Sequence, residues 1–591
     1  MTALMMCSGD SGEINTSLPL ETPARRGFSI SYMGKTLLSR IDPVTQGERA
    51  AADISVKERT LYLCPSPLYG YGLSVLLDRL RELPAQSSAI LCIEADENLF
   101  EISRKALKAI LPNLNHATCP PTGRATQRRE GINIDFESQL CAFAPLRDEF
   151  EVIAFVKKNW GERFFSRVET IHLTGGWQLF PERYASIETT LRREIAAEWS
   201  NAMTLIKLGR LYSRNLIRNL ALLAKSHDAA ALDFGSSPVL ALGAGTSLDS
   251  FLDELSRCQG ERRFKIICAD SCLPALLERG IIPDIAVILE SQHWNLRAFS
   301  GLRGQKIDAA LDLSALPPSA NVLAGKRFFF ATPWTTLALF ARLNEAGLLP
   351  KTFPPLGSVG LNVVALALAS GSGLVFTAGL DFSYTLDAYH ARSAAGHNDL
   401  LIKQNRFKGI FNTAAAFREG SFVAASKTGK PLRSDPAMRN YRDLFEQCFG
   451  GNKRLFDVGG TGLPLGIKTV SPAEAFTVLY DGAKKAAEKD TTQIAAQKKI
   501  TAEKLKQFIQ KEIDILKTLK EMLTGETAPD NKYLEELLDA ADYLWAHFPD
   551  CAAAGRRRPS CTDLNFLKRV RVEIEPFMKL WLSNTNLPKG M

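Results

Sequence analysis

The chain of 591 residues lacks the signatures of several common protein classes. It has eleven cysteines but no C-x-x-C pair, so neither a zinc site nor a disulfide framework is predicted, and reduced thiols of a cytosolic protein are expected. The N-terminus has no basic region ahead of a long apolar stretch, so no signal peptide is expected. The longest apolar region, Val363–Leu380, is interrupted by serines and glycines, and this indicates a buried helix and strand rather than a membrane span.

Neither sign of charge dominates the chain. The net charge of +8 is modest at this length, so it suits an anionic substrate without requiring nucleic acid. The basic clusters carry no interleaved aromatic residues, and we interpret them as solvated loops: Arg25-Arg26, Arg128-Arg129 and Arg556-Arg557-Arg558. The sequence therefore predicts no nucleic-acid partner and no stable membrane insertion.

Several catalytic motifs are also absent. The chain has no G-x-S-x-G elbow, no Walker lysine and no H-E-x-x-H pair. Metal-dependent glycosyltransferases often carry a D-x-D motif, but Asp308 and Asp312 do not have that spacing. No metal site is implied, and no cofactor is expected.

What is present is a long pattern of strands alternating with helices. The length allows three or four domains of ~100–200 residues each. We expect an α/β protein: a Rossmann-like N-terminal domain, a helical linker, a central domain with a doubly wound, mainly parallel sheet, and an all-helical C-terminal region. The predicted boundaries are 1–175, 176–231, 232–480 and 481–591.

The most informative segment is Val239–Asp249, V-L-A-L-G-A-G-T-S-L-D. It is an apolar run followed by a glycine-rich turn and the start of a helix. Such a helix start offers unpaired N–H groups and a partial positive charge to a phosphate. A tight strand-to-helix turn needs glycine in any α/β protein, so a purely structural interpretation stays open. The predicted nucleotide-binding residues of this turn are Gly243, Gly245, Thr246 and Ser247.

Polar residues also end the neighbouring strands that the sequence predicts. Asp270 and Ser271 follow the strand Phe264–Ala269, and Glu290 follows Ile285–Leu289. Ligands bind at such carboxyl ends in open α/β sheets. Further strands are predicted over residues 327–331, 353–359 and 374–378, and a second phosphate-binding helix start is predicted at Gly357 and Ser358.

Two later residues are candidates for proton transfer. Asp381 ends an apolar strand, where a carboxyl group needs a partner. His390 follows closely, and an imidazole can act as a base near neutral pH, although a lone histidine is more often structural. The predicted catalytic residues are His390, Asp381 and Asp249, of which Asp249 would orient a sugar or base hydroxyl, or the backbone of a loop.

The two ends of the chain allow competing interpretations. Near the N-terminus, a strand, the turn Gly70-Tyr71-Gly72 and a helix precede a strand that ends on Glu94, which is the order of a ribose-binding domain. Pro65 and Pro67 stand where a cofactor-binding turn has glycines, and this favours a degenerate scaffold. At the C-terminal side, the apolar stripe of residues 505–523 favours helix packing over a docking face for a partner.

The order of these motifs resembles the Maf (motility-associated factor) flagellin glycosyltransferases, whose central domain is related to 6-hydroxymethylpterin pyrophosphokinases. The matching segments include G-A-G-T-S-L-D at 243–249, I-I-C-A-D-S at 266–271, G-I-I-P-D-I-A-V at 280–287, G-S-V-G at 357–360, G-L-D-F-S-Y at 379–384 and the helix around 213–219. The resemblance covers about 42 to 475 and implies a sialyltransferase-like central domain.

The resemblance also implies a function. A bacterial cytoplasmic enzyme would move a nonulosonic acid, of the pseudaminic or legionaminic type, from a CMP-activated donor to Ser or Thr of flagellin, with inversion and without a metal. Flagellin and the nucleotide sugar would be its partners, and flagellum assembly and motility would depend on it. Two alternatives stay open: a magnesium-dependent pterin pyrophosphokinase that uses Asp249, Asp270, Asp284 and Asp381, and a non-catalytic flagellin-binding chaperone.

Overall fold

The computed structural model of the chain describes residues 18–585 apart from several short gaps. The gaps are 84–87, 111–114, 117–139, 146–148, 161–164, 258–261, 263, 386–387, 408, 410–419, 487–499, 526–529 and 554–557.

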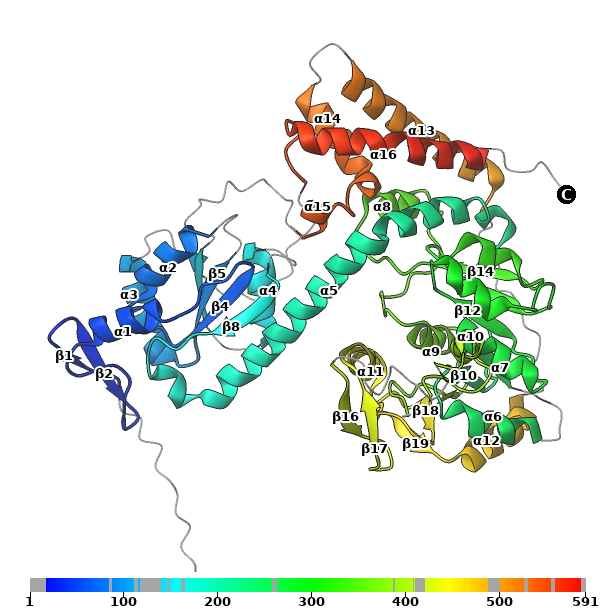
Figure 1. The fold of residues 1–591 in the computed structure, drawn as a ribbon, viewed down its shortest axis with the longest axis horizontal. Helices are drawn as coiled ribbons and strands as arrows, with labels where there is room; N and C mark the ends of the chain where they lie inside the picture. Colours follow the sequence, from blue (N-terminus) through cyan, green and yellow to red (C-terminus); the bar gives the residue numbers. More distant parts are fainter. Residues whose placement is uncertain are drawn as a thin grey trace, which may run out of the picture. The chain divides into compact units, whose positions relative to one another are not determined.

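Contacts within the chain divide it into two compact units, and each is described by itself. The first unit runs to Ile206 and includes Phe548–Arg558. The second comprises Lys207–His547 and the residues from Pro559 onward. Helix α5, Pro181–Leu220, confirms the long helix that the sequence predicts and continues from the first unit into the second (Figure 1). The four domain boundaries drawn from the sequence stay a prediction.

The first unit is built on a five-stranded parallel sheet with the strand order β6-β7-β5-β4-β8. Every residue of β4 and β5 is buried, as is usual for parallel strands that helices cover on both faces. This confirms the Rossmann-like topology. Its elements are β4 Thr60–Pro65, α2 Leu73–Arg81, β5 Ala89–Glu94, α3 Glu97–Ile110, β6 Asn115–His116, β7 Cys141–Pro145, α4 Glu149–Trp160 and β8 Arg167–Thr170, preceded by β1 Leu20–Pro23, β2 Phe28–Tyr32, β3 Lys35–Thr36 and α1 Pro43–Ala52.

The second unit contains a nine-stranded sheet with the order β19-β18-β15-β10-β11-β12-β13-β14-β9, and every pairing in it is parallel. The doubly wound parallel sheet predicted from the sequence is confirmed. Its strands are β9 His227–Asp228, β10 Val239–Leu242, β11 Lys265–Ala269, β12 Ile285–Ile288, β13 Asp308–Asp312, β14 Arg327–Phe330, β15 Val375–Ala378, β18 Leu455–Val458 and β19 Lys468–Val470.

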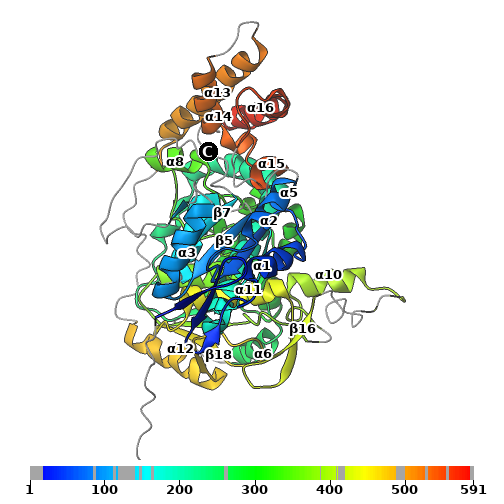
Figure 2. The same ribbon diagram turned by 90° about the vertical axis from the view of Figure 1, so that its left-hand side faces the viewer.

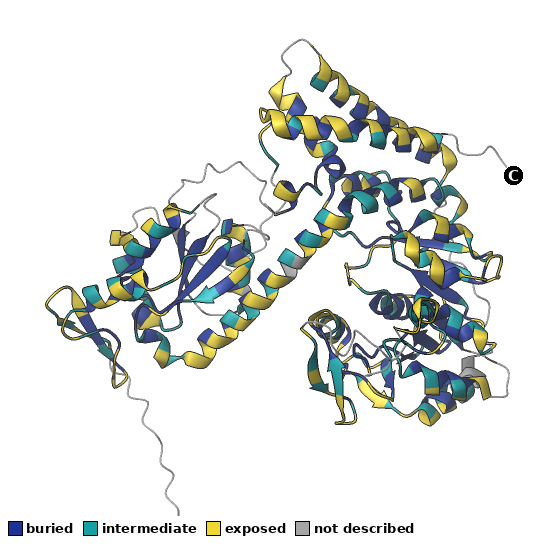
Figure 3. Ribbon diagram, viewed as in Figure 1, coloured by how far each residue is buried: buried dark blue, intermediate teal, exposed yellow. Residues whose placement is uncertain are grey.

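Helices cover this sheet, and its strands from β18 to β14 are largely buried, whereas the edge strands β19 and β9 are not (Figure 3). Helix α9 packs across β10, β11, β12 and β15, and α6 meets α12 through stacked rings of Phe251 and Phe476. The helices are α6 Leu248–Arg257, α7 Leu273–Glu278, α8 Ala338–Glu345, α9 Val359–Ala369, α10 Ala395–Lys403, α11 Pro436–Phe449 and α12 Pro472–Ala486. A hairpin of β16 Phe422–Ala425 and β17 Pro431–Ser434 stands apart from the sheet.

One strand prediction is wrong. Residues 353–359 do not form a strand, and only Thr352 makes an isolated bridge, to Ala331. Pro354 and Pro355 explain the failure, because neither has a backbone N–H to donate to a neighbouring strand. The segment is instead the loop that leads into α9.

The C-terminal region is helical, as the sequence predicts. Its helices are α13 Ala502–Thr524, α14 Asn531–Ala540, α15 Pro549–Ala553 and α16 Leu564–Thr585. The apolar stripe of α13 is buried from Leu505 to Leu519, and α13 packs along α16. The stripe is therefore a packing face within the chain, the first of the two interpretations drawn from the sequence.

Candidate functional site

The candidate site lies where the sheet order reverses, between β10 and β15. The chain proceeds from β10 through β11 to β14 on one side, whereas β15 returns to the other side of β10. The loops after two such strands diverge, and in open α/β sheets ligands bind there. Gly243–Ser247 follow β10 and Gly379–Asp381 follow β15, so the structure brings together two of the segments that the sequence singled out.

The glycines of the turn allow close packing against the loop that follows β15. The N–H of Gly243 donates to Ala378 O at 2.9 Å, and that of Gly245 donates to Gly379 O at 2.8 Å. A Cβ atom at Gly243 would lie 2.4 Å from Gly379 O, and one at Gly245 would lie 2.6 Å from a carboxylate oxygen of Asp381. The turn needs glycine because the loop after β15 crosses it closely, which supports the structural interpretation of these residues without excluding a ligand beside them.

Asp381 is buried against the start of α6. Its Oδ2 accepts the backbone N–H of Ser247 at 2.8 Å and the hydroxyl of Thr246 at 3.3 Å, and its Oδ1 accepts the hydroxyl of Ser247. Burial raises the pKa of Asp381, and the hydrogen bonds from Ser247 oppose this rise. The Ser247 N–H that the sequence offers to a phosphate is thus bonded to a carboxylate of the same chain.

Sequence reasoning missed a lysine, Lys427, whose charge acts on Asp381. Lys427 lies in the turn of the β16–β17 hairpin, and its Nζ forms an ion pair with Asp457 at 2.7 Å in which both side chains are almost fully buried. Its positive charge also lowers the pKa of Asp381. The loop between β18 and β19 packs against this group, because Gly462 O accepts the N–H of Lys427 and a Cβ at Gly462 would lie 2.9 Å from Asp381 Cα. A lysine in a hairpin turn normally faces solvent, so no local signal marked it.

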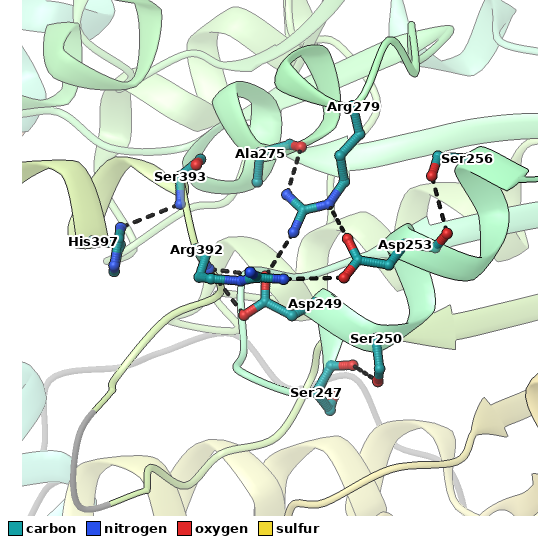
Figure 4. Close-up of polar contacts among 10 residues, drawn as sticks. All are labelled: Ser247, Asp249, Ser250, Asp253, Ser256, Ala275, Arg279, Arg392, Ser393 and His397. Carbon is teal, nitrogen blue, oxygen red and sulfur yellow. Dashed lines mark hydrogen bonds and ion pairs between the residues drawn. The ribbon is translucent and has the colours of Figure 1, made fainter.

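Asp249 is engaged with two arginines and a loop backbone (Figure 4). Its Oδ1 accepts a hydrogen bond from Arg279 Nη2 at 3.0 Å, and both carboxylate oxygens accept the backbone N–H of Arg392 at 3.0 Å. Asp253, one turn further along α6, binds the same two arginines at 2.7 and 3.0 Å. Of the roles that the sequence suggests for Asp249, this geometry favours holding the loop backbone over binding a sugar hydroxyl.

The loop held in this way carries His390. The N–H of Ala391 donates to Ala244 O at 3.0 Å, which sets the loop directly on the glycine turn. The His390 imidazole is half-buried, and a Cβ at Gly396 in the first turn of α10 would lie 2.4 Å from its Nδ1. Burial first, and the charge of His397 second, lower the pKa of His390. A neutral imidazole can accept a proton at pH 7, so the geometry is compatible with a base.

A second cluster lies at the ends of β11 and β12. Asp270 is buried and accepts the N–H of Ser271 at 2.7 Å and Asn295 Nδ2 at 2.9 Å. Burial raises the pKa of Asp270 to about 6, and the nearby charge of Glu290 adds to the rise. Glu290 itself accepts the N–H of Gln292 at 2.9 Å.

The charge of Glu290 acts on two tyrosines that sequence reasoning missed. Burial and the charge of Glu290 raise the pKa of Tyr212, on α5, to about 12, and they raise that of Tyr441, on α11. Gly357 lies beside this group, because a Cβ there would be 3.1 Å from the Tyr441 ring. Ser358 takes the N-cap position of α9 but its side chain forms no capping bond. Tyr441 thus lies beside the start of α9 and within the electrostatic range of Glu290.

The segment of α5 around Asn215 and Asn219 positions these loops. Asn215 Nδ2 donates to Ser291 O and Ser314 O, and Asn219 Nδ2 donates to Leu313 O and Ala315 O, at 2.8 to 3.1 Å. Asn215 therefore joins the loops after β12 and β13, and Asn219 binds the loop after β13 at two carbonyls, so the helix motif at 213–219 has a structural explanation.

The carboxylates considered for magnesium do not gather. Asp249 binds arginines, Asp270 binds Asn295 and Asp381 binds Ser247, while Asp284 accepts the N–H of Ile266 and pairs with Arg262. Within the described ranges, no three His, Cys, Asp or Glu side chains lie close enough together to hold a metal ion. No helix in that part of the chain is both long and apolar enough to span a bilayer.

Comparison with known proteins places the fold. Residues 214–387 match the family model described as 6-hydroxymethylpterin diphosphokinase MptE-like. The structure of a MAf glycosyltransferase from Magnetospirillum magneticum AMB-1 is similar over 98% of this chain and 94% of its own, with a TM-score of 0.53 and 12% sequence identity. At that identity the likeness concerns the fold. It confirms the resemblance to Maf proteins with an MptE-like central domain.

A sequence relative of similar length extends the comparison. A protein of Treponema pallidum (strain Nichols), described only as an uncharacterized protein, is 29% identical over 594 residues. The similarity covers 97% of this chain and 96% of that protein. Both units are therefore shared with this relative.

Proposed function

We propose that this protein is a glycosyltransferase that moves a nonulosonic acid from a CMP-activated donor to Ser or Thr of flagellin in the cytoplasm, before export. The observation that carries the proposal is the candidate site at the sheet's reversal point, in a fold that matches a Maf glycosyltransferase over 98% of the chain. Sites of this kind suit nucleotides, because strand ends and helix N-termini converge there.

His390 is proposed as the base. The acceptor hydroxyl attacks the anomeric carbon, its proton passes to the imidazole, and the bond from that carbon to the donor phosphate breaks with its electrons leaving on CMP. This single displacement inverts the anomeric carbon and needs no covalent enzyme intermediate. The lowered pKa of His390 supports the assignment, since the imidazole must be neutral to accept the proton.

The start of α9 is the favoured place for the CMP phosphate. The start of α6 is less suited, because the carboxylate of Asp381 already accepts the Ser247 N–H. Ser358 caps α9 without a side-chain bond to it, and an eleven-residue helix presents a partial positive charge at this end. Tyr441 beside Gly357 adds a hydroxyl near the same point.

Two measurements test the proposal. Titration of the purified protein with CMP and CDP by calorimetry should give saturable binding, and a folded protein that takes up neither at millimolar concentration would contradict a cytidine-nucleotide site. The intact mass of flagellin from cells with and without this protein should differ by whole nonulosonic acid residues. An unchanged mass would reject flagellin as the acceptor.

A pterin diphosphokinase is the second candidate, and the family match over residues 214–387 favours it. That reaction would require magnesium, whereas the proposed transfer is expected to proceed without it. Activity that EDTA abolishes and magnesium restores would therefore favour the kinase or a metal-dependent transferase. Binding of flagellin without donor turnover would instead support a non-catalytic chaperone.

A further inference from the structure

Helix α10 is unusual because none of its residues is buried, although two of its last three are large and apolar. Leu401 is 45% and Ile402 is 82% exposed, and Phe407, just beyond the helix, is 89% exposed. Figure 2 shows α10 at the periphery of the fold. Contiguous exposed apolar side chains are characteristic of interaction sites.

The 3-10 helix η7, His293–Phe299, contributes to the same surface. It packs against α10, and an ion pair joins its Arg297 to Asp399 of α10. Side chains three apart in a 3-10 helix lie on one side, so Trp294 is on the side of Arg297. In α10, Ile402 is three residues beyond Asp399 and shares its side of the helix. Exposed Trp294 and Ile402 therefore flank the ion pair.

We define the α10 surface as Trp294, Leu401, Ile402 and Phe407, all of them exposed. The charges among η7 and residues 395–407 are Arg297, Lys403, Arg406 and the single carboxylate Asp399, which pairs with the first two. The surface is therefore apolar with an excess of positive charge. Its complement is an apolar segment flanked by Asp or Glu.

The α10 surface is also tied to the candidate base. Gly396, in the first turn of α10, packs directly on the His390 imidazole. Ile402 is six residues further on, which is about 9 Å at 1.5 Å per helical residue. A segment bound on the α10 surface can thus reach His390 with about three extended residues, at ~3.3 Å each.

We propose that the α10 surface docks the protein acceptor, through an apolar segment that carries acidic residues a few positions from the modified Ser or Thr. The inference rests on the proposed transfer to a protein hydroxyl. It differs from docking on the C-terminal helices, since the apolar stripe of α13 is buried within the chain.

The test compares Ile402→Glu and Phe407→Glu with Val572→Glu, which alters a 71% exposed apolar residue of α16 away from this surface. Binding of monomeric flagellin to the full-length protein is measured by calorimetry, together with CMP affinity and the transfer kinetics. Each α10 substitution should weaken flagellin binding about tenfold to hundredfold. It should raise the KM for flagellin with little change in kcat or CMP affinity. The conservative substitution Ile402→Leu should keep flagellin binding near the wild-type level. Val572→Glu should behave as the wild type.

Charge gives an independent readout. Arg406→Glu should weaken binding and reduce its dependence on salt, because one favourable long-range interaction becomes repulsive. Transfer by the wild type with an unchanged KM in both α10 variants would overturn the docking site alone. Flagellin binding that depends on the α10 surface but yields no transfer would overturn the proposed function alone. If the wild type does not bind flagellin, the docking proposal fails.

Discussion

At the scale of single residues, the environment of His390 determines when it can accept a proton. The imidazole is half-buried between the glycine turn and α10, and burial lowers its pKa below the usual 6.5. A base must be neutral to accept a proton, so the His390 imidazole can act as a base at lower pH than an ordinary histidine.

We therefore expect the acid limb of the pH–rate profile to lie at lower pH than it would for a base with the ordinary histidine pKa of 6.5. His390→Ala should lower the rate ~10²–10⁴-fold at pH 7.5 while the thermal unfolding midpoint stays near that of the wild type. His397→Gln removes the neighbouring charge that lowers the pKa of His390, so it should move the acid limb of the pH profile upward. An unaltered rate in His390→Ala would leave Asp381 or Glu290 as the next candidate base.

Glu94 offers a residue-scale prediction in the first unit. It is buried, accepts Ser66 Oγ at 2.7 Å and Tyr184 Oη at 3.0 Å, and burial raises its pKa from 4.5 to about 7. Between these two values the unfolded chain has lost the proton that the folded chain keeps, so the free energy of unfolding falls as pH rises and is level above pH 7.

Each pKa unit corresponds to about 1.4 kcal/mol, so this interval allows a loss of up to about 3 kcal/mol. Glu94→Gln should therefore be more stable relative to the wild type at pH 8 than at pH 5, as measured by urea unfolding. The exposed Glu97→Gln serves as the control and should show the wild-type pH dependence. A relative stability of Glu94→Gln that is independent of pH would contradict a carboxyl group protonated by burial. The buried, bonded position of Glu94 also favours the scaffold interpretation of this domain over ribose binding.

At the scale of secondary-structure elements, the junction of β10 and β15 depends on a backbone approach that no side chain can occupy. A Cβ at Gly243 would lie 2.4 Å from the Gly379 carbonyl oxygen, and a backbone carbonyl cannot swing aside as a side chain does. Adjoining strands would have to separate to make room.

Gly243→Ala should therefore lower the free energy of unfolding of the second unit by about 1–3 kcal/mol, measured by chemical denaturation. It should also weaken nucleotide binding if the nucleotide lies at this turn. Gly235→Ala is unsuitable as a control because its φ is +58°, so Gly409→Ala is used, since no described atom outside its chain neighbours lies within 4 Å of the added methyl group. Equal stability of the two variants would mean that the junction is not closely packed.

Local elements that depend only on near neighbours agree with the sequence. The residue types Ser471-Pro472-Ala473-Glu474 predict a capping box at the start of α12, and the structure contains it: Ser471 Oγ accepts the Glu474 N–H at 3.2 Å, and Glu474 Oε2 accepts the Ser471 N–H at 2.7 Å. Four consecutive residues contain the whole arrangement, so their order was sufficient to predict it.

At the scale of the whole molecule, an ion pair with a buried carboxylate joins α13 to α8 within the second unit. Glu512 of α13 is 1% exposed and binds Arg342 of α8 through two hydrogen bonds of 2.7 and 2.9 Å. The pair is one of the contacts that place α13 in the same compact unit as the sheet.

Removal of Glu512 leaves the Arg342 guanidinium, whose side chain is 23% exposed, without its partner. Glu512→Ala should destabilise the second unit by about 1–3 kcal/mol. Glu575, which pairs with Lys520 at the surface at 2.9 Å, provides the control, and Glu575→Ala should leave the unfolding midpoint almost unchanged. Similar midpoints for both variants would show that α13 is not held through this pair.

The sequence by itself determined the features that depend on short stretches of chain. The apolar runs of β10, β11 and β15, the glycine turn, the buried stripe of α13 and the long helix α5 are all set by the spacing of residue types. That spacing acts over one turn or one strand, and each such pattern has one favourable local solution. The order of the motifs was sufficient to indicate the Maf-like fold.

Only the tertiary structure decided which residues meet. Lys427 comes 46 residues after Asp381, and the charge of Glu290 acts on Tyr212 and Tyr441, which lie on separate helices. Ser247 was predicted to cradle a phosphate, but its N–H is bonded to Asp381, and Asp249 holds Arg392 rather than an open ligand position. Such contacts depend on strand order in the sheet and on the packing of distant helices. A hydrogen-bonding group takes the partner that folding brings within about 3 Å, and no local pattern encodes that choice.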